Sequence, residues 1–306
     1  MNVSESYKTP GSFIVTVMFF VLVCCPPGLA ATVIDQAGNR IEVPKEPQRI
    51  VSLAPSITEM IFALGQQDKL KGVTRFSDYP AAARDLPRVG SYIRLDIERI
   101  LALQPDLCLA IKDGNPKYHI DKIKEFGIPV FAIDPQNLAE IMKTILEIGS
   151  LLGAEQRAGE LVRDMQERID RVKQKVDKVA GRPKVFFQVD IEPIISIGTN
   201  TFINELITLA GGVNAAAGAE VYPRFSWEEI LMLQPQVVIM TSMAGEHTPE
   251  KLIATWKRWK DVPASRNDRL YVVDANLFGR PTSRLVEGLE VLADIIHPDE
   301  KGGGGD

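Results

Sequence analysis

The sequence predicts an α/β protein made of two related lobes joined by one long α-helix. Short apolar runs alternate with segments of helical periodicity in both halves of the 306-residue chain. This alternation is typical of mainly parallel sheets covered by helices. A proline-free segment between the halves has the apolar spacing of a long helix. A thirteen-residue motif occurs once in each half, which indicates that the two lobes share an architecture.

The first half predicts four short strands, because four β-rich apolar runs are bounded by turn residues. Ser56 and Glu59 have the spacing of a capping box before the helical run 60–64. A further helix is predicted around residues 121–126, between the last two strands. The predicted strands are residues 49–54, 70–74, 106–111 and 129–133.

A helical stretch without proline extends from Leu138 to Val179. We expect a break near Gly153, followed by one continuous helix over residues 156–179. Its apolar residues recur three and four positions apart, and its 24 residues would span about 36 Å. That length suits a strut between two lobes.

The second half resumes the alternation, with strands expected at 184–189, 237–240 and 270–273 and helices at 202–210 and 286–296. The repeated motif supports two related lobes. Residues 98–110 and 228–240 are identical at six of thirteen positions, and each reads as a short helix, a proline and a buried strand.

The first thirty residues have the pattern of a secretory signal peptide. An early cation precedes an apolar run over residues 13–23, and Gly28 and Ala30 place small residues at the two positions that a signal peptidase reads. We expect cleavage after Ala30 or Ala31 and a periplasmic location. The alternatives are an uncleaved anchor and a lipid anchor on Cys24 or Cys25. Neither cysteine follows the small residue that a lipoprotein signal requires.

The predicted domain organisation follows from these features. It comprises a signal peptide over residues 1–30, a first lobe over 31–155, a connecting helix over 156–181, a second lobe over 182–298 and a flexible tail over 299–306.

Composition excludes several classes of function. The chain is 45% hydrophobic and 25% charged, as expected for a soluble globular protein. Its net charge is -5 with both signs interspersed. It therefore has no basic block for nucleic acid, and a mildly acidic chain gains nothing from an anionic membrane surface.

The sequence has no recognisable catalytic motif. It lacks a nucleophile elbow, a phosphate-binding glycine loop and the paired histidines of a zinc protease. The histidines, His119, His247 and His297, lie far apart in the sequence, and we predict no metal site and no catalytic cofactor. Cys108 lies in an apolar strand and reads as a buried small hydrophobe. We therefore expect a binding protein, with an extracytoplasmic α/β enzyme as the rival.

Aromatic residues are concentrated in loops that follow predicted strands or precede predicted helices. Ligand clefts of open α/β sheets form at such loops. Aromatic faces suit a broad, flat and largely apolar ligand. For any single residue, packing as a lid over its own lobe is the alternative. These residues are Phe76, Tyr79, Tyr92, Tyr222 and Phe278.

Four ordered motifs carry a family resemblance. They are RIVSLAPSITE at residues 49–59, FSDYP at 76–80, DIERI at 96–100 and QPD at 104–106. Together they resemble the periplasmic vitamin-B12-binding proteins, within the wider family of ABC-importer proteins that bind siderophores, haem or cobalamin. The resemblance covers about residues 48–296. It implies two Rossmann-like lobes joined by one long α-helix, the helical-backbone periplasmic binding protein fold, with a corrinoid bound in the interlobe cleft.

The resemblance also implies which residues line that cleft, namely Phe76, Tyr92, Tyr222, Phe278 and Arg280. The sequence departs from the family pattern at several of these positions. Phe76 stands where the best-known member has tyrosine, and Tyr92 and Tyr222 stand where it has tryptophans. Two further departures are Val189 in place of phenylalanine and Asn276 in place of aspartate.

These departures leave haem or a ferric siderophore open as the ligand. Ferric siderophores recruit arginines to meet their charge, and haem requires an axial ligand. The candidate arginines are Arg75, Arg94, Arg224 and Arg280, and the weak axial candidates are Tyr92, His119 and His247.

Glu98 and Glu228 occupy equivalent positions in the repeated motif. We expect Asp96 and Ser226 to be N-caps, so that both glutamates fall in a first helical turn, and we assign Glu229 to a capping box with Ser226. An acidic residue there is also stabilised by the helix dipole alone. The resemblance implies that Glu98 and Glu228 lie at the lobe tips and meet arginines of a permease dimer. The free protein is expected to be a monomer.

Overall fold

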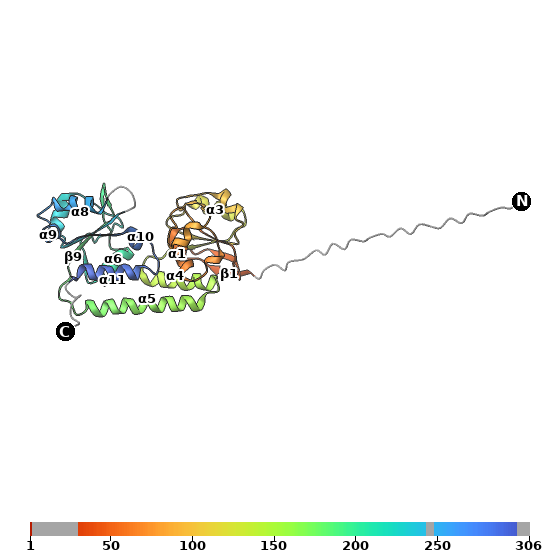
Figure 1. Ribbon diagram of the computed structural model, residues 1–306, viewed down its shortest axis with the longest axis horizontal. Coiled ribbons are helices and arrows are strands. Elements are labelled where there is room, and N and C mark those ends of the chain that lie inside the picture. The colour runs from red at the N-terminus through yellow and green to blue at the C-terminus, as the bar shows by residue number, and fades with distance from the viewer. Residues whose placement is uncertain (2–29, 243–247, 299–306) are drawn as a thin grey trace.

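The computed structural model describes Met1, residues 30–242 and residues 248–298. Two α/β lobes lie side by side above a layer of helices (Figure 1). The predicted fold class is therefore confirmed. Apart from Met1 and Ala30, the predicted signal peptide lies outside the described residues, as do His247 and the predicted tail. In the part of the chain that is described, no helix combines the length and apolar character needed to cross a membrane.

The first lobe is built on a four-stranded parallel sheet in the order β4-β3-β7-β8. The two central strands are almost entirely buried and apolar, as both faces of a parallel sheet are covered. The four strands span Leu70–Gly72 (β4), Ile50–Ser52 (β3), Leu107–Ile111 (β7) and Val130–Ile133 (β8). All four were predicted from the sequence.

The remaining elements of the first lobe surround this sheet. The β1-β2 hairpin, which was not predicted, is antiparallel. Their bounds are Ala30–Ile34 (β1), Arg40–Pro44 (β2), Pro55–Ala63 (α1), Gln67–Lys69 (η1), Ala81–Asp85 (η2), Gly90–Ser91 (β5), Arg94–Leu95 (β6), Ile97–Ala102 (α2), Lys117–Glu125 (α3) and Leu138–Leu151 (α4).

The second lobe repeats the topology of the first. Its parallel sheet has the order β12-β9-β14-β15, so in each lobe the second strand along the chain flanks the first, which pairs with the third. In both sheets the strand order therefore reverses at the same place, between the first and third strands along the chain. The four strands span Val213–Asn214 (β12), Lys184–Gln188 (β9), Val237–Ser242 (β14) and Leu270–Asp274 (β15).

The other elements of the second lobe are helices and a small antiparallel sheet, β10-β11-β13. Their bounds are Asp190–Ile191 (β10), Ile194–Ile195 (β11), Phe202–Leu209 (α6), Arg224–Phe225 (β13), Trp227–Leu233 (α7), Pro249–Lys257 (α8), Pro263–Arg266 (α9), Ala275–Phe278 (α10) and Leu285–Ile296 (α11).

The repeated sequence motif has the same conformation in both lobes. Helices α2 and α7 are capped by the side chains of Asp96 and Ser226, as predicted. Each helix is followed by a glutamine in the left-handed conformation, Gln104 with φ 47° and Gln234 with φ 49°. A proline and a central strand come next, so the two copies are structurally equivalent.

One long helix, α5 (Glu155–Val176), connects the lobes. It contacts α4 of the first lobe and α11 of the second, and Figure 1 shows it running beneath both. Its 22 residues span about 33 Å. The helix predicted over residues 156–179 is thus present and ends three residues earlier.

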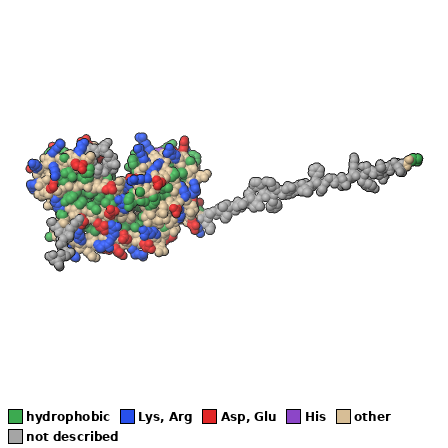
Figure 2. Space-filling view, viewed as in Figure 1, with side chains coloured by type: hydrophobic (Ala, Val, Ile, Leu, Met, Phe, Trp, Pro, Cys, Tyr) green, Lys and Arg blue, Asp and Glu red, His purple; other side chains and the backbone are tan. Residues whose placement is uncertain are grey.

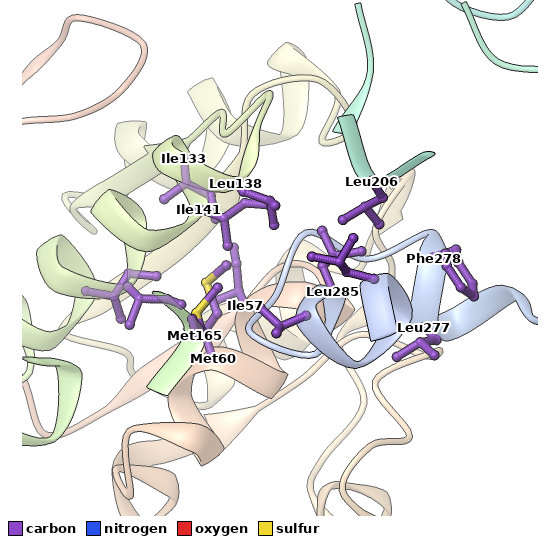
Figure 3. Close-up of a cluster of buried hydrophobic side chains, with 14 of the residues drawn as sticks. Ile57, Met60, Ile133, Leu138, Ile141, Met165, Leu206, Leu277, Phe278 and Leu285 are labelled. Carbon is purple, nitrogen blue, oxygen red and sulfur yellow. The ribbon is translucent and has the colours of Figure 1, made fainter. Parts of the chain in front are cut away.

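One hydrophobic cluster extends through both lobes (Figure 3), and each lobe has a further cluster of its own. Ile57 of α1 and Met165 of α5 belong to the same cluster as Leu206 of α6 and Leu285 of α11. Beside it, the Leu138 N–H at the start of α4 donates to the Glu205 carboxylate of α6 over 2.8 Å. The junction between the lobes is therefore packed, and it includes a side-chain hydrogen bond.

The predicted capping box at the start of α1 is wrong. The helix begins at Pro55 with Ala54 as its N-cap, and no side chain caps it. Ser56 and Glu59 both lie inside the helix and are buried. Pro55 has no N–H, so one of the unpaired donors usual at a helix start is absent here.

Candidate functional site

The candidate site lies where the carboxyl edges of the two sheets face each other. Arg280, which follows β15 and α10 of the second lobe, donates to the Phe76 carbonyl, which follows β4 of the first lobe. The loops at both edges therefore meet across the interlobe space. Figure 2 shows the surface hollowed between the lobes. Ligands of open α/β sheets bind at this edge, near the point where strand order reverses.

Three exposed aromatic residues lie in loops at the carboxyl edge of the first sheet. One of them, Tyr79, is 45% exposed, and the Arg284 guanidinium of the second lobe lies 3.8 Å from the centre of its ring. Phe76 is 52% exposed, with the Arg75 guanidinium 5.4 Å from the centre of its ring. Tyr92 is 36% exposed and lies in the turn between β5 and β6. These two predicted site residues therefore present apolar surface to solvent at the expected edge.

Asn115 holds the Tyr92 turn in place. Its buried amide donates to the carbonyls of Leu53 and Tyr92 over 2.9 and 2.8 Å. Its side-chain oxygen accepts from the Ile111 N–H over 2.8 Å. One side chain thus fastens the turn to the ends of β3 and β7. Buried amides with every bond made in this way fix local geometry. Nothing in the sequence indicates this role beyond the position of Asn115 after a strand.

A buried hydroxyl network supports the Phe76 loop. The Thr58 hydroxyl donates to the Ser52 hydroxyl at 2.8 Å and lies 3.1 Å from the Ser77 hydroxyl. The Thr74 and Ser77 hydroxyls are 3.0 Å apart. The Arg88 guanidinium also donates to the carbonyls of Thr74 and Ser77. The backbone of this loop is therefore fixed to its own lobe.

Tyr222 presents an aromatic ring from the second lobe and is 61% exposed. Its loop is held by backbone bonds on either side, from the Ser196 N–H to Pro223 and from the Gly198 N–H to Val221. A Cβ on Gly198 would lie 1.7 Å from the Glu220 carbonyl oxygen, so only glycine fits there. The close approach of these two segments positions Tyr222 before β13.

Phe278 does not belong to the exposed aromatic set. Its side chain is fully buried, with its ring 5.5 Å from that of Phe187 and packed against Gly288. The expectation that it lines a ligand surface is wrong for this structure, because α10 turns the residue into the core of the second lobe. The ring fills space that the absence of a side chain at Gly288 leaves open.

Arg280 is at the predicted edge but is occupied by protein partners. Its guanidinium contacts the Glu59 and Asp78 carboxylates at 2.7 and 2.9 Å, and the Phe76 carbonyl at 3.0 Å. The Arg280 side chain is 11% exposed and that of Glu59 is 3% exposed. Arg284 lies 3.5 Å from the other Glu59 oxygen. Sequence reasoning missed Glu59, whose partners are more than two hundred residues away.

Burial and the neighbouring arginines act in opposite directions on the pKa of Glu59, and burial has the larger effect. Burial raises the pKa of this carboxyl above its ordinary value, while the hydrogen bond and charge of Arg280, and then those of Arg284, act in the opposite direction. Thr282 adds a hydroxyl 3.4 Å from the same carboxylate. The cluster thus contains two carboxylates and two guanidinium groups, whose formal charges cancel. The four residues are Glu59, Asp78, Arg280 and Arg284.

Glu98 and Glu228 both occupy exposed first-turn positions, in α2 and α7. In the described chain neither carboxylate forms an ion pair. Glu229, by contrast, completes a capping box with Ser226, as predicted. The hydrogen bonds from Ser226 lower the pKa of the Glu229 carboxyl. Glu98 and Glu228 are thus available for a partner, whereas Glu229 is used locally.

The remaining candidates do not assemble a reactive centre. Cys108 is buried, and burial followed by the charge of Asp106 raises the pKa of its thiol well above the ordinary value. His119 is half-buried on α3, and its Nδ1 has no hydrogen-bond partner in the described chain. Among the described residues, no group of three or more histidine, cysteine or acidic side chains is placed to hold a metal ion.

Comparison with known proteins identifies the family of the chain. The profile of the periplasmic binding protein family matches residues 50–277. An uncharacterised ABC transporter substrate-binding lipoprotein of Bacillus subtilis, YvrC, is 34% identical over 273 residues, covering 87% of this chain and 85% of the relative.

Two solved structures are similar over most of the chain. The periplasmic vitamin B12-binding protein BtuF of Vibrio cholerae superposes with a TM-score of 0.73 at 30% identity, covering 85% of this chain and all of that protein. The periplasmic haem-binding protein RhuT of Roseiflexus sp. RS-1, in its apo form, gives a TM-score of 0.75 at 27% identity, covering 83% and 99%. Proteins described as binding two different ligands thus share the fold.

Proposed function

Because this chain belongs to the periplasmic binding protein family, we propose that it captures a corrinoid and delivers it to an ABC importer. The family and the fold are those of substrate-binding proteins of ABC transporters, which act outside the cytoplasm and are not enzymes. The identity of the ligand, the docking residues, the permease dimer and the monomeric state are the proposed parts.

The exposed aromatic residues at the facing sheet edges carry the proposal. Phe76 and Tyr92 of the first lobe and Tyr222 of the second each present a ring to solvent. A single apolar residue exposed on a surface needs no explanation, but three aromatic rings at the edges that face one cleft do. Broad aromatic faces match the flat, partly apolar ring of a corrinoid. The likeness to a vitamin B12-binding protein adds to this reading.

Haem or a ferric siderophore is the second candidate, and arginines favour it. Arg75, Arg94 and Arg224 are exposed and lie within two residues of Phe76, Tyr92 and Tyr222, respectively. No ion pair holds any of the three within the described chain. Guanidinium groups of this kind would meet the carboxylates of haem or the negative charge of a ferric siderophore.

An absorption spectrum distinguishes these ligands. The purified protein is incubated separately with cyanocobalamin, haemin and a ferric hydroxamate siderophore and then desalted, so that only bound ligand remains. We expect the corrinoid spectrum to be retained at one ligand per chain. Calorimetry that detects no cyanocobalamin binding at micromolar concentrations, alongside retention of haemin, would transfer the assignment to haem.

Two aromatic truncations test the site itself. Tyr92→Ala and Tyr222→Ala should each weaken cyanocobalamin binding by about 1–3 kcal/mol, the range for a packed aromatic anchor. Phe126→Ala is the matched control, because Phe126 is equally exposed but follows α3 at the opposite edge of the first sheet. Calorimetry gives the three affinities. Equal effects at all three positions would contradict a site in the cleft.

A further inference from the structure

Glu59, Asp78, Arg280 and Arg284 form a charged cluster that connects the two lobes, which we call the interlobe clamp. Glu59 lies on α1 and Asp78 in the Phe76 loop, both in the first lobe. Arg280 and Arg284 lie in the segment between α10 and α11 of the second lobe. The clamp therefore joins segments about two hundred residues apart, through contacts as short as 2.7 Å.

The planar guanidinium of Arg280 is the centre of the clamp. One of its terminal nitrogens donates to Glu59, and the other donates both to the Asp78 carboxylate and to the Phe76 carbonyl. Three acceptors from two different segments are satisfied by one rigid fork. A lysine presents a single point charge on a flexible stem and does not reproduce that geometry.

The Phe76 loop is consequently held from two sides. Arg88 and the Thr58 hydroxyl network fasten it to the first lobe, and Arg280 fastens it to the second. The side chain that this loop exposes, Phe76, faces solvent at the carboxyl edge of the sheet. Its orientation therefore depends on a residue of the opposite lobe.

We propose that Arg280 is a positioning residue, which acts through the interlobe clamp to hold Phe76 in its ligand-facing orientation. It does not contact the ligand. This inference rests on the proposed ligand-binding function, and it reassigns Arg280 from the lining of the cleft to the support of that lining. It also makes the second lobe responsible for the shape of the first lobe's binding surface.

A measurement without ligand tests the structural half of the proposal. In hydrogen–deuterium exchange followed by mass spectrometry, Arg280→Met should make the amides of residues 75–79 exchange about tenfold faster, because the loop opens locally. Arg280→Lys should preserve the global stability but show the same faster exchange. Arg168→Met is the control, since Arg168 forms a similar two-bond pair with Glu290 away from the cleft. Unchanged exchange in both Arg280 variants overturns the proposal.

A double-mutant cycle tests the functional half, with cyanocobalamin and haemin as the probes. Arg280→Met should weaken binding of the retained probe about tenfold when Phe76 is present and less than about twofold in the Phe76→Ala background. Additive losses would show that Arg280 touches the ligand itself and would overturn the proposal. Should Arg280→Met fold poorly, Asp78→Asn replaces it, because Asp78 is the exposed partner of the clamp.

The two halves separate this inference from the proposed function. If neither probe binds the wild-type protein, the proposed function fails while the exchange experiment still decides whether Arg280 holds the loop. If a probe binds and exchange is unaffected, the proposed function stands and the positioning role is discarded.

Discussion

His297 is a buried histidine whose surroundings favour its neutral form. It follows α11 and is 7% exposed, and a Cβ on Gly211 would lie 2.6 Å from its Nε2. Burial lowers the pKa of the imidazole below its ordinary 6.5, and nearby cations including Arg182 act in the same direction, against a backbone hydrogen bond at Gly211. The folded state therefore binds a proton less readily than the unfolded chain.

This difference predicts a pH dependence of stability. The contribution is present in full above pH 6.5 and is lost as pH falls through the lower pKa of the folded state. Between pH 6.5 and 5, we expect the free energy of unfolding to fall more steeply in the wild type than in His297→Gln, by at most about 1.4 kcal/mol per pH unit. Urea unfolding across this range measures both curves. Parallel curves would contradict the prediction.

Single residues show where sequence reasoning stops. Phe76 and Phe278 were both predicted to lie in loops beside strands, yet Phe76 is exposed in a loop and Phe278 is fully buried at the end of α10. The difference depends on Gly288 of α11, which leaves room for the Phe278 ring. Glu59 was assigned a local role from its spacing to Ser56, whereas its partners come from residue 280 onward. Long-range pairing leaves no periodic signal in the sequence.

At the scale of secondary-structure elements, the two motif copies differ in one respect that can be measured. Gln104 and Gln234 both adopt left-handed backbone angles, which cost a side-chain-bearing residue about 1–2 kcal/mol. The Gln234 amide donates to the carbonyls of Leu231 and Asp261 at 2.7 and 3.3 Å. Within the described chain the side-chain amide of Gln104 makes no such hydrogen bond.

We therefore predict unequal effects of glycine at these two positions. Gln104→Gly should stabilise the protein by about 0.5–1 kcal/mol, because glycine adopts positive φ without strain but loses more entropy on folding. Gln234→Gly should gain less, since the relief of strain is offset by two lost hydrogen bonds. Urea unfolding followed by circular dichroism compares the variants. A larger gain at Gln234 would show that its side-chain bonds contribute nothing.

The elements that could be predicted from sequence are those encoded locally. The central strands β3, β7, β9 and β14 are continuous apolar runs, and the amphipathic pattern of α5 extends over its whole length. The β1-β2 hairpin was missed because β1 is half exposed and lacks an apolar run. The bounds of α1 were misjudged because a polar pair at capping distance lies inside the helix.

At the scale of the whole molecule, the junction between the lobes limits their relative motion. The hydrophobic core is continuous across it, α5 contacts both lobes, and polar contacts cross it at two places, from Leu138 to Glu205 and in the interlobe clamp. A long helix has few soft dihedrals compared with a pair of extended strands. The wide hinge of strand-linked binding proteins is therefore not expected.

We predict a small closure when ligand binds, with lobe displacements below about 2 Å. Crystal structures with and without cyanocobalamin measure this displacement directly, and small-angle scattering checks it in solution. Arg280→Met, which removes the polar link at the cleft, should enlarge the displacement. A large lobe rotation in the wild-type protein would contradict the prediction.

At the scale of the whole molecule, one exposed glutamate from each lobe bears on docking to an importer. Glu98 and Glu228 are exposed in equivalent helices, one in each lobe. The two lobes share one topology, so Glu98 and Glu228 occupy equivalent positions in them. A permease with two identical subunits can therefore present one matching site to each lobe. Surface charges at such contacts mainly set orientation and the rate of encounter.

Glu98→Arg combined with Glu228→Arg should abolish transport and docking while ligand affinity stays unchanged, because neither residue belongs to the aromatic set proposed to bind the ligand. Glu42→Arg with Glu46→Arg is the control, since these residues are also exposed and the substitution changes the net charge equally. Docking is measured on the permease in nanodiscs, and uptake in proteoliposomes. Normal uptake by the Glu98 and Glu228 double variant would leave both residues as dipole-stabilised side chains only, whereas equal loss in the control would point to net charge instead of specific contact.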